Sequence, residues 1–419
     1  MHYNRLIAGV LAINVVLAWA AAAAGWWHGP ATRLEAIGAL AQANLVIAVL
    51  PRQAYVVNLV GWAATRPSTR WPRRLRWTLG KYYHLGGLHV GAAVAGTLWY
   101  VAFVASTAAD RLRAAPAVTT LNVVLAGAVA AVFVGMVLTA LPRFRARFHD
   151  HFELAHRFGA WTALGLVWIN TVLFAHARHP GTPVTVAVLE TPLAWLLALT
   201  TTLALWPWLL LRKVAVDVER PSDHAVIVHL DHDAAVDIGT TRAISRHPLV
   251  GWHQFAVVVP APGRSGYRML VSRAGDWTAE FVDDPPTHVW VRGLPAAGVA
   301  NVRRLFTKVV FVVTGSGIGP ALSHLLADEM PTKLVWVTKA PRRTYGDAFV
   351  DEVLTAQPDA MIWNTDERGK PDVLALAYEA YATTGAEAVV CVANRHVTWQ
   401  VVHGLEQRGI PAFGPIWDS

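Results

Sequence analysis

The stretch FVVTGSGIGP, from Phe311 to Pro320, joins an apolar run to a glycine-rich turn. The run predicts a buried strand, and the residues after the turn predict a helix. Because glycines carry no side chain, the backbone can approach phosphate oxygens, while the helix N-terminus offers oriented N–H donors. The pattern therefore predicts a dinucleotide pyrophosphate site, and a tight turn without a ligand is the alternative. The expected contacts are Thr314, Gly315, Ser316, Gly317, Gly319 and Pro320.

Strands and helices alternate after this turn. The apolar runs KVVFVVT, KLVWVT, AMIW and AEAVVCV are separated by helical segments at about 320–328, 347–356 and 372–383, and a further helix is expected at about 397–407. Such alternation predicts a doubly wound parallel sheet, in which ligands bind at the carboxyl ends of the strands. We therefore expect a nucleotide-binding α/β domain over residues 301–419.

Residues 214–300 carry a different pattern. Five short apolar runs, VAVDV, HAVIVHL, QFAVVV, YRMLV and HVWV, follow one another with proline, glycine and aspartate between them. Strands this close together leave no room for crossover helices. The pattern therefore predicts a small antiparallel β-barrel or sandwich.

The first half of the chain is unusually apolar. The 419 residues are 54% hydrophobic and only 15% charged, which is too apolar for an ordinary soluble enzyme. Six segments in residues 1–213 are long enough to cross a bilayer core, which needs about 20 apolar residues. We therefore expect a six-helix transmembrane bundle, followed by a cytoplasmic barrel and the doubly wound domain. The segments are about 6–27, 36–63, 82–107, 119–141, 154–177 and 190–211, with Pro51 and Arg52 interrupting the second.

Lysine and arginine collect on one side of these segments. Twelve share a side with the N-terminus and four lie on the other. Cytoplasmic loops accumulate such residues, so we expect a cytoplasmic-membrane protein with both termini in the cytoplasm, where NAD(P)H is available. The formal charge of +8 then reflects residues beside anionic lipids and does not predict nucleic-acid binding. The twelve are Arg5, Arg66, Arg70, Arg73, Arg74, Arg76, Lys81, Arg143, Arg145, Arg147, Arg212 and Lys213; the four are Arg33, Arg111, Arg113 and Arg178.

Membrane segments, a small β-module and an α/β module with TGSGIGP together resemble the ferric reductase and NADPH oxidase superfamily, whose soluble half is similar to ferredoxin-NADP reductase. The resemblance extends over most of the chain. It is strongest to a branch of bacterial and fungal membrane proteins, some of which occur beside or fused to adenylate-forming enzymes. The resemblance implies a flavoprotein with FAD and NADP or NAD as cofactors, and a neighbouring biosynthetic enzyme as a partner.

Two motifs carry the flavin half of the resemblance. The family pattern Trp-His-Pro-Phe-Thr/Ser reads Trp-His-Gln-Phe-Ala at 252–256, so the histidine and the aromatic ring are present while the proline and hydroxyl are absent. The run Gly-Asp-Trp-Thr at 275–278 resembles the family's second flavin turn, and a surface turn is its alternative. The implied FAD contacts are His253, Phe255, Gly275, Trp277 and Thr278.

Other residues are candidates for binding NAD(P) and for acting beside its nicotinamide. The resemblance implies catalytic roles for Cys391, near the nicotinamide, and for Trp417, over the flavin, and 370–372 resembles the family's Arg-Pro-Asn motif. Core packing is the alternative for both catalytic candidates. Three cations after the second strand suit a 2′-phosphate and favour NADPH over NADH, with a solvated basic turn as the alternative. These cations are Lys339, Arg342 and Arg343.

Histidines in the apolar half point to haem. The resemblance implies two histidines, 13 or 14 residues apart, on each of two helices, because four imidazoles hold two stacked haems. His84 and His156 lie at similar depth near the cytoplasmic side and suit one haem b iron, with His89 as a lesser candidate. The outer partners are missing, since positions 97, 98, 169 and 170 hold Thr, Leu, Ile and Asn. Arg52 is expected to meet a haem propionate or a buried polar residue such as Asn44 or Asn58.

These expectations combine into one function and one rival. The first is a membrane-bound flavin oxidoreductase in the lipid bilayer that passes electrons from NAD(P)H through FAD, with or without one inner-leaflet haem. Its acceptor would be a small molecule dissolved in the membrane or the cytoplasm. The rival is a nucleotide-responsive membrane regulator or scaffold that has lost electron transfer, in keeping with Gln254, Ala256 and the missing histidines.

Overall fold

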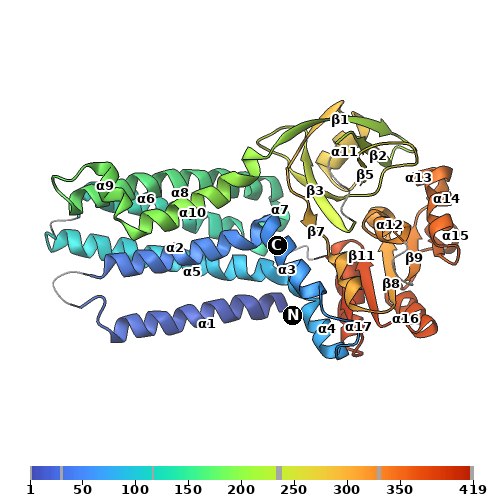
Figure 1. Cartoon of the computed structure of the whole chain (residues 1–419), viewed down its shortest axis with the longest axis horizontal. Coiled ribbons are helices and arrows are strands. Elements are labelled where there is room, and N and C mark those ends of the chain that lie inside the picture. Colours follow the sequence, from blue (N-terminus) through green and yellow to red (C-terminus); the bar gives the residue numbers. More distant parts are fainter. Residues whose placement is uncertain (1, 29–31, 116–117, 233–237, 328–331, 416–419) are drawn as a thin grey trace. The chain divides into compact units, whose positions relative to one another are not determined.

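A computed structural model describes residues 2–28, 32–115, 118–232, 238–327 and 332–415 (Figure 1). The chain forms two compact units. Residues 2–53 and 84–206 make the first, which we call the helical unit, and residues 54–83 and 207–415 make the second, which we call the sheet unit. Both sheets therefore lie in the sheet unit. Residues 54–83, from the apolar half of the sequence, belong to this unit as well.

Within the residues that the structure describes, six helices are long and apolar enough to cross a membrane, by length and composition. Their number agrees with the six predicted segments. They are packed through α2, α5, α6, α8 and α10, whose buried residues form a continuous core. The helices of this half of the chain are α1 (His2–Ala23), α2 (Leu34–Val49), η1 (Leu50–Arg52), η2 (Tyr82–Leu85), α5 (Gly86–Leu112), α6 (Thr120–Thr139), α7 (Pro142–Arg147), α8 (His149–Arg178), α9 (Val184–Leu189) and α10 (Pro192–Leu209).

The second predicted segment, 36–63, is not one span. The apolar helix ends at Arg52, because Pro51 cannot donate the next backbone hydrogen bond. A separate helix, α3 (Ala54–Thr65), belongs to the sheet unit. There the Asn58 amide donates to the Pro295 carbonyl (2.8 Å) and accepts from the Ala297 N–H (2.7 Å).

The sequence analysis expected Asn44 or Asn58 as a polar partner of Arg52, but in the structure both asparagines bond other residues. Asn58 is occupied by the sheet unit, and the Asn44 amide exchanges hydrogen bonds of 2.8 and 3.0 Å with Asn14. The Trp99 indole donates to Asn14 as well (2.9 Å). This network joins α1, α2 and α5, and Arg52 instead lies in electrostatic range of His89 and His156.

The predicted antiparallel module is a seven-stranded, nearly closed barrel. Its path is β4-β3-β6-β1-β2-β5, and β7 pairs with β3. Val258 and Arg268 exchange two backbone hydrogen bonds of 2.9 Å, which bring the chain after β4 against β5 and close the sheet. The strands are β1 (Arg212–Glu219), β2 (Ala225–Leu230), β3 (Thr240–Ser245), β4 (His253–Ala256), β5 (Tyr267–Ser272), β6 (His288–Val291) and β7 (Ala296–Ala297).

The predicted parallel sheet is confirmed with the order β10-β9-β8-β11-β12. Helices cover both faces: α12 and α14 pack on one, α16 and α17 on the other. The strands are β8 (Val309–Thr314), β9 (Thr332–Thr338), β10 (Met361–Asn364), β11 (Ala388–Val392) and β12 (Ala412–Phe413). The helices are η3 (Val299–Leu305), η4 (Gly315–Gly317), α12 (Ile318–Leu326), α13 (Pro341–Tyr345), α14 (Asp347–Ala356), α15 (Thr365–Arg368), α16 (Val373–Thr384) and α17 (Arg395–Glu406).

An ion pair fastens α4 (Arg73–Leu79) to the parallel sheet. The buried Arg76 guanidinium donates to both carboxylate oxygens of Glu387 (2.9 Å each) and to the Leu305 carbonyl (2.8 Å). Thr307 donates its N–H and hydroxyl to the same carboxylate (2.7 and 2.9 Å). These hydrogen bonds, chiefly that from Arg76, lower the pKa of Glu387 to about 2.

We predict that Arg76→Met destabilises the chain by about 2 to 3 kcal/mol, because the carboxylate and the Leu305 carbonyl both lose a charged donor. The depressed pKa stabilises the fold fully above the ordinary value of 4.5 and progressively less as the pH falls toward about 2. Thermal unfolding of the purified chain between pH 7 and pH 3 should show this acid sensitivity weakened in Arg76→Met. The control is Arg74→Met, at an exposed neighbour, and equal effects of the two substitutions would contradict the role of the pair.

Candidate functional site

The glycine turn begins where β8 ends, at the centre of the parallel sheet. Gly315 adopts the left-handed conformation, with φ of 51°, which favours glycine. The indole of Trp336 on β9 donates a hydrogen bond to the Gly315 carbonyl (2.9 Å). The single turn η4 then leads into α12, so the strand, turn and helix predicted from the sequence are all present.

Gly317 is where the chain passes closest to its neighbour. A Cβ atom placed on Gly317 would collide with the carbonyl oxygen of Val392, at the end of β11. From β8 the sheet continues to β9 on one side and to β11 on the other, so this is the point at which strand order reverses. Such a switch point opens the crevice in which doubly wound sheets bind ligands.

Ser272 ties the barrel to this turn. It ends β5, and its hydroxyl lies 2.6 Å from the Ser316 hydroxyl in the glycine turn. Ser323 on α12 also donates to the Val257 carbonyl of the barrel (2.6 Å). The sequence reasoning missed Ser272, although a hydroxyl directly after a buried strand is a usable signal.

Of the remaining pyrophosphate candidates, Thr314 ends β8 and lies directly before the turn. Gly319 and Pro320 lie in the first turn of α12. A Cβ on Gly319 would meet only the Leu270 Cβ, at an ordinary 3.6 Å, so the fold itself does not require glycine there. The structure thus brings all six predicted residues into one strand–turn–helix segment.

The three predicted phosphate-binding cations lie on and beside α13, and each already has a carboxylate partner. Arg342 pairs with Asp347 (3.0 Å) and Asp351 (2.7 Å). Arg343 and Lys339 both face Asp366, at 2.9 and 3.9 Å. Exposed pairs of this kind contribute little to stability, so a phosphate can replace the carboxylates at small cost.

The two flavin motifs meet in the barrel. The rings of His253 and Trp277 stack with centroids 4.2 Å apart and an interplanar angle of 29°. Phe255 lies 6.1 Å from the same indole at a similar angle. His253 and Trp277 touch directly, so a third ring cannot lie between them and would have to stack on an outer face of the cluster.

Gly275 and Thr278 form the start of a helix that the sequence analysis did not predict, α11 (Asp276–Asp283). The Thr278 hydroxyl accepts hydrogen bonds from the Ala274 and Gly275 N–H groups (2.9 and 3.0 Å). The side chain therefore caps the helix, and the turn is ordered by its own residues. This helix places Trp277 against His253.

Cys391 does not reach the crevice. It is fully buried in the cluster between the sheet and helices α16 and α17, and burial raises the pKa of its thiol to about 12. Asp372, in the motif at 370–372, accepts from the Ala375 N–H (3.1 Å) and caps α16. Trp417 lies outside the described residues, so its role over a flavin stays a prediction.

In the helical unit, the structure pairs the histidines differently from the sequence prediction. His156 on α8 lies beside His89 on α5, with ring centroids 6.1 Å apart. His84 lies 5.8 Å from the ring of His2. The Nδ1 of His89 lies 2.8 Å from the Ala48 carbonyl oxygen.

Two substitutions distinguish the role of the glycine turn in stability from its predicted role in nucleotide binding. Gly317→Ala should cost about 1 to 3 kcal/mol, because the added methyl group overlaps the Val392 carbonyl. Gly319→Ala should leave the melting temperature nearly unchanged and weaken NADPH binding, because the methyl group stands between the helix N-terminus and the pyrophosphate. Thermal unfolding and calorimetric titration measure both effects. Equal stability of the two variants would rule out the close approach at Gly317.

The chain has one cysteine, so thiol titration reports on Cys391 alone. A buried, protonated thiol is a poor nucleophile, so we expect no reaction with Ellman's reagent in the folded chain at pH 8. One equivalent should react after unfolding in guanidinium chloride. Rapid reaction of the folded chain would instead show that the thiol reaches the surface and would restore its candidacy beside the nicotinamide.

Comparison with known proteins gives two long fungal relatives. Adenylate-forming reductases 03009 and 06235 of Coprinopsis cinerea are each 38% identical over all 419 residues, and the chain spans 40% of the length of either. Among solved structures, the ferredoxin NADP+ reductase of Neisseria gonorrhoeae with bound FAD and NADP is 14% identical. It aligns over 49% of this chain and 98% of its own, with a TM-score of 0.39. Over residues 299–419 the chain matches the family described as adenylate-forming reductase 03009, C-terminal domain.

Proposed function

We propose that this chain is a flavin oxidoreductase that takes reducing equivalents from NAD(P)H. The observation that carries the proposal is the contact of Ser272 with Ser316, which joins a nearly closed barrel to a glycine turn at the switch point of a parallel sheet. The barrel holds both flavin-motif aromatics, and the sheet holds the pyrophosphate turn. The relatives named as reductases support the same class of activity.

In this proposal the nucleotide lies along the carboxyl edge of β8 and β9. The N–H groups at the start of α12 hold the pyrophosphate, and Gly319 leaves space for it. Lys339, Arg342 and Arg343 exchange their carboxylate partners for a 2′-phosphate, which makes NADPH the preferred donor. Binding of NADPH is then expected to be more sensitive to salt than binding of NADH.

FAD is proposed to stack on the outer face of the aromatic cluster formed by His253, Phe255 and Trp277. The isoalloxazine, when bound, accepts a hydride and releases electrons singly. Trp277 is held in place by α11, and its indole also lies over Gly251, where a Cβ would come within 3.2 Å of Nε1. The chain therefore offers a rigid aromatic surface, while Ala256 supplies no hydroxyl to the flavin.

We further propose that the six apolar helices lie in the cytoplasmic membrane, with the sheet unit in the cytoplasm. The lysine and arginine asymmetry supports this orientation. Large apolar side chains on α1 support a lipid environment, since Val15 and Trp19 are 68% and 74% exposed. The electron acceptor is then a small molecule of the membrane or the cytoplasm, and a neighbouring biosynthetic enzyme is its proposed source.

One haem b is proposed between His89 and His156, in place of the pair His84 and His156. The two rings lie 6.1 Å apart between centroids, and their imidazoles would hold the haem iron, which would supply one-electron transfer. The Ala48 carbonyl orients His89 through Nδ1, as second-shell acceptors commonly do for ligating histidines. Arg52 lies in electrostatic range of both rings and is suited to a propionate.

Absorbance spectra of the purified chain test these proposals. We expect a flavin band that bleaches on addition of NADPH under argon, and a Soret band in the same preparation. The Soret band should be lost in His89→Ala and in His156→Ala, because each removes an imidazole that would hold the iron, and kept in the control His176→Ala. Loss of the band in His84→Ala, with His89→Ala unaffected, would return the site to the pair expected from the sequence.

The rival function makes the opposite prediction for the same sample. A regulator or scaffold without electron transfer would be colourless after loading with FAD and haem, and it would still bind NADPH. The direct stacking of His253 on Trp277 favours this rival if flavin cannot use an outer face of the cluster. Trp277→Ala would then leave the spectrum unchanged, whereas in a flavoprotein it should release FAD.

A further inference from the structure

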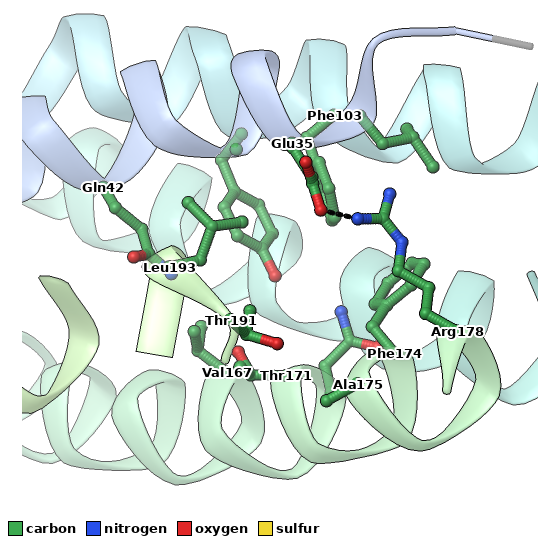
Figure 2. Close-up of a pocket in the computed structure, with 14 residues that line it drawn as sticks. Glu35, Gln42, Phe103, Val167, Thr171, Phe174, Ala175, Arg178, Thr191 and Leu193 are labelled. Carbon is green, nitrogen blue, oxygen red and sulfur yellow. Dashed lines mark ion pairs between the residues drawn. The ribbon is translucent and has the colours of Figure 1, made fainter. Parts of the chain in front are cut away.

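We propose that a cavity in the helical unit binds a neutral lipophilic molecule with a hydroxyl head group. The cavity lies between α2, α5, α8 and the residues at the start of α10 (Figure 2). The empty space between these residues is about 610 Å³ when the solvent at its mouth is included. The inference goes beyond the proposed function, and its test requires no electron transfer.

The walls of the cavity are aromatic and aliphatic. Phe103 and Phe174 stand 5.8 Å apart between ring centroids, on α5 and α8. Leu193 faces them from the start of α10, and Val167 extends the same surface along α8 (Figure 2). These side chains offer hydrophobic contact and few polar groups, so the body of the ligand must be apolar.

Gln42 supplies a polar group without a partner. It lines the cavity from α2 and is only 7% exposed. Its Oε1 is shielded from solvent and has no hydrogen-bond partner within the described ranges. Leaving such a group unpaired costs about 1 to 3 kcal/mol, so a ligand that donates a hydrogen bond there gains affinity. Oε1 accepts only, so a hydroxyl can pair with it, whereas an ether or a ketone could pair only with the Nε2 donor of the same amide.

The charge of the cavity selects a neutral ligand. Glu35 and Arg178 are the charged residues of its lining, and they form an ion pair with each other (Figure 2). The remaining polar side chains are uncharged amides and hydroxyls. Inside, the Asn170 carbonyl oxygen already accepts from Asn122 (3.1 Å). A charged ligand would therefore have to break the ion pair or enter without a partner.

Asn170 also explains why this part of the bundle can hold a ligand other than haem. The residue occupies a position at which the sequence resemblance implied an outer haem ligand, and its amide lies beside the Tyr100 hydroxyl. Uncharged hydrogen-bonding groups stand here in place of an imidazole. This level of the bundle is therefore suited to a small oxygenated molecule and not to an iron porphyrin.

The probe for the test is tritiated 4-hexylphenol, which is neutral at pH 7 and has one hydroxyl group on an apolar body. Binding is measured by scintillation proximity with the full chain in lipid nanodiscs, and empty nanodiscs correct for partitioning into lipid. We expect saturable binding that unlabelled 4-hexylphenol displaces and hexylbenzene, which lacks the hydroxyl, does not. Displacement by both compounds would show that the cavity binds apolar molecules without recognising the hydroxyl group, and this result would overturn the proposal.

Two variants locate the site. Gln42→Leu keeps the size of the side chain and should weaken binding about tenfold, equivalent to about 1.4 kcal/mol. Gly38→Leu should abolish binding, because even a Cβ there would lie 3.2 Å from Leu193 and 3.5 Å from Phe103. Thr202→Leu, an exposed position on α10, is the control and should bind as the natural chain does. Undiminished binding in Gln42→Leu, or no saturable binding in the natural chain, would refute the site.

Discussion

The closeness of Gly317 to the Val392 carbonyl is the constraint on which the sheet unit depends. No side chain fits between Gly317 and the end of β11, so glycine is required at this position, where strand order reverses. From there Ser316 reaches Ser272 at the end of a barrel strand. The close approach at Gly317 and the contact of Ser316 with Ser272 together hold the glycine turn between β11 and this edge of the barrel.

Residues 54–83 connect two apolar helices in sequence and yet fold with the sheets. Asn58 uses both ends of its amide on the backbone around β7, and Arg76 forms a two-pronged ion pair with Glu387. The Lys81 ammonium adds a hydrogen bond of 2.6 Å to the Ala412 carbonyl. These contacts are polar and specific, so the segment is part of the sheet unit's structure and more than a linker whose charges set orientation.

The two sites proposed for the helical unit differ in their chemistry. One gathers His89, His156 and Arg52, which suit a metal-bound anionic cofactor. The other is lined by Gln42 and aromatic walls, with its charges already paired. Both proposals agree with the absence of histidine at positions 169 and 170. Where the resemblance implied a second haem ligand, Asn170 accepts a hydrogen bond from Asn122 on the neighbouring helix α6.

Local sequence patterns determined the six apolar helices, the two sheets and the glycine turn, because hydrophobic periodicity and glycine spacing act within a few residues. They did not reveal that α3 leaves the apolar bundle, since Asn58 finds its partners more than 200 residues away. Nor did they show that the ring of His89 lies beside that of His156, because His84 and His89 lie on neighbouring turns and only packing against α8 distinguishes them. For Cys391 the sequence left a place beside the nicotinamide and core packing both open, because a strand end looks alike in sequence whichever face its side chain occupies. The tertiary structure buries the thiol between the sheet and helices α16 and α17.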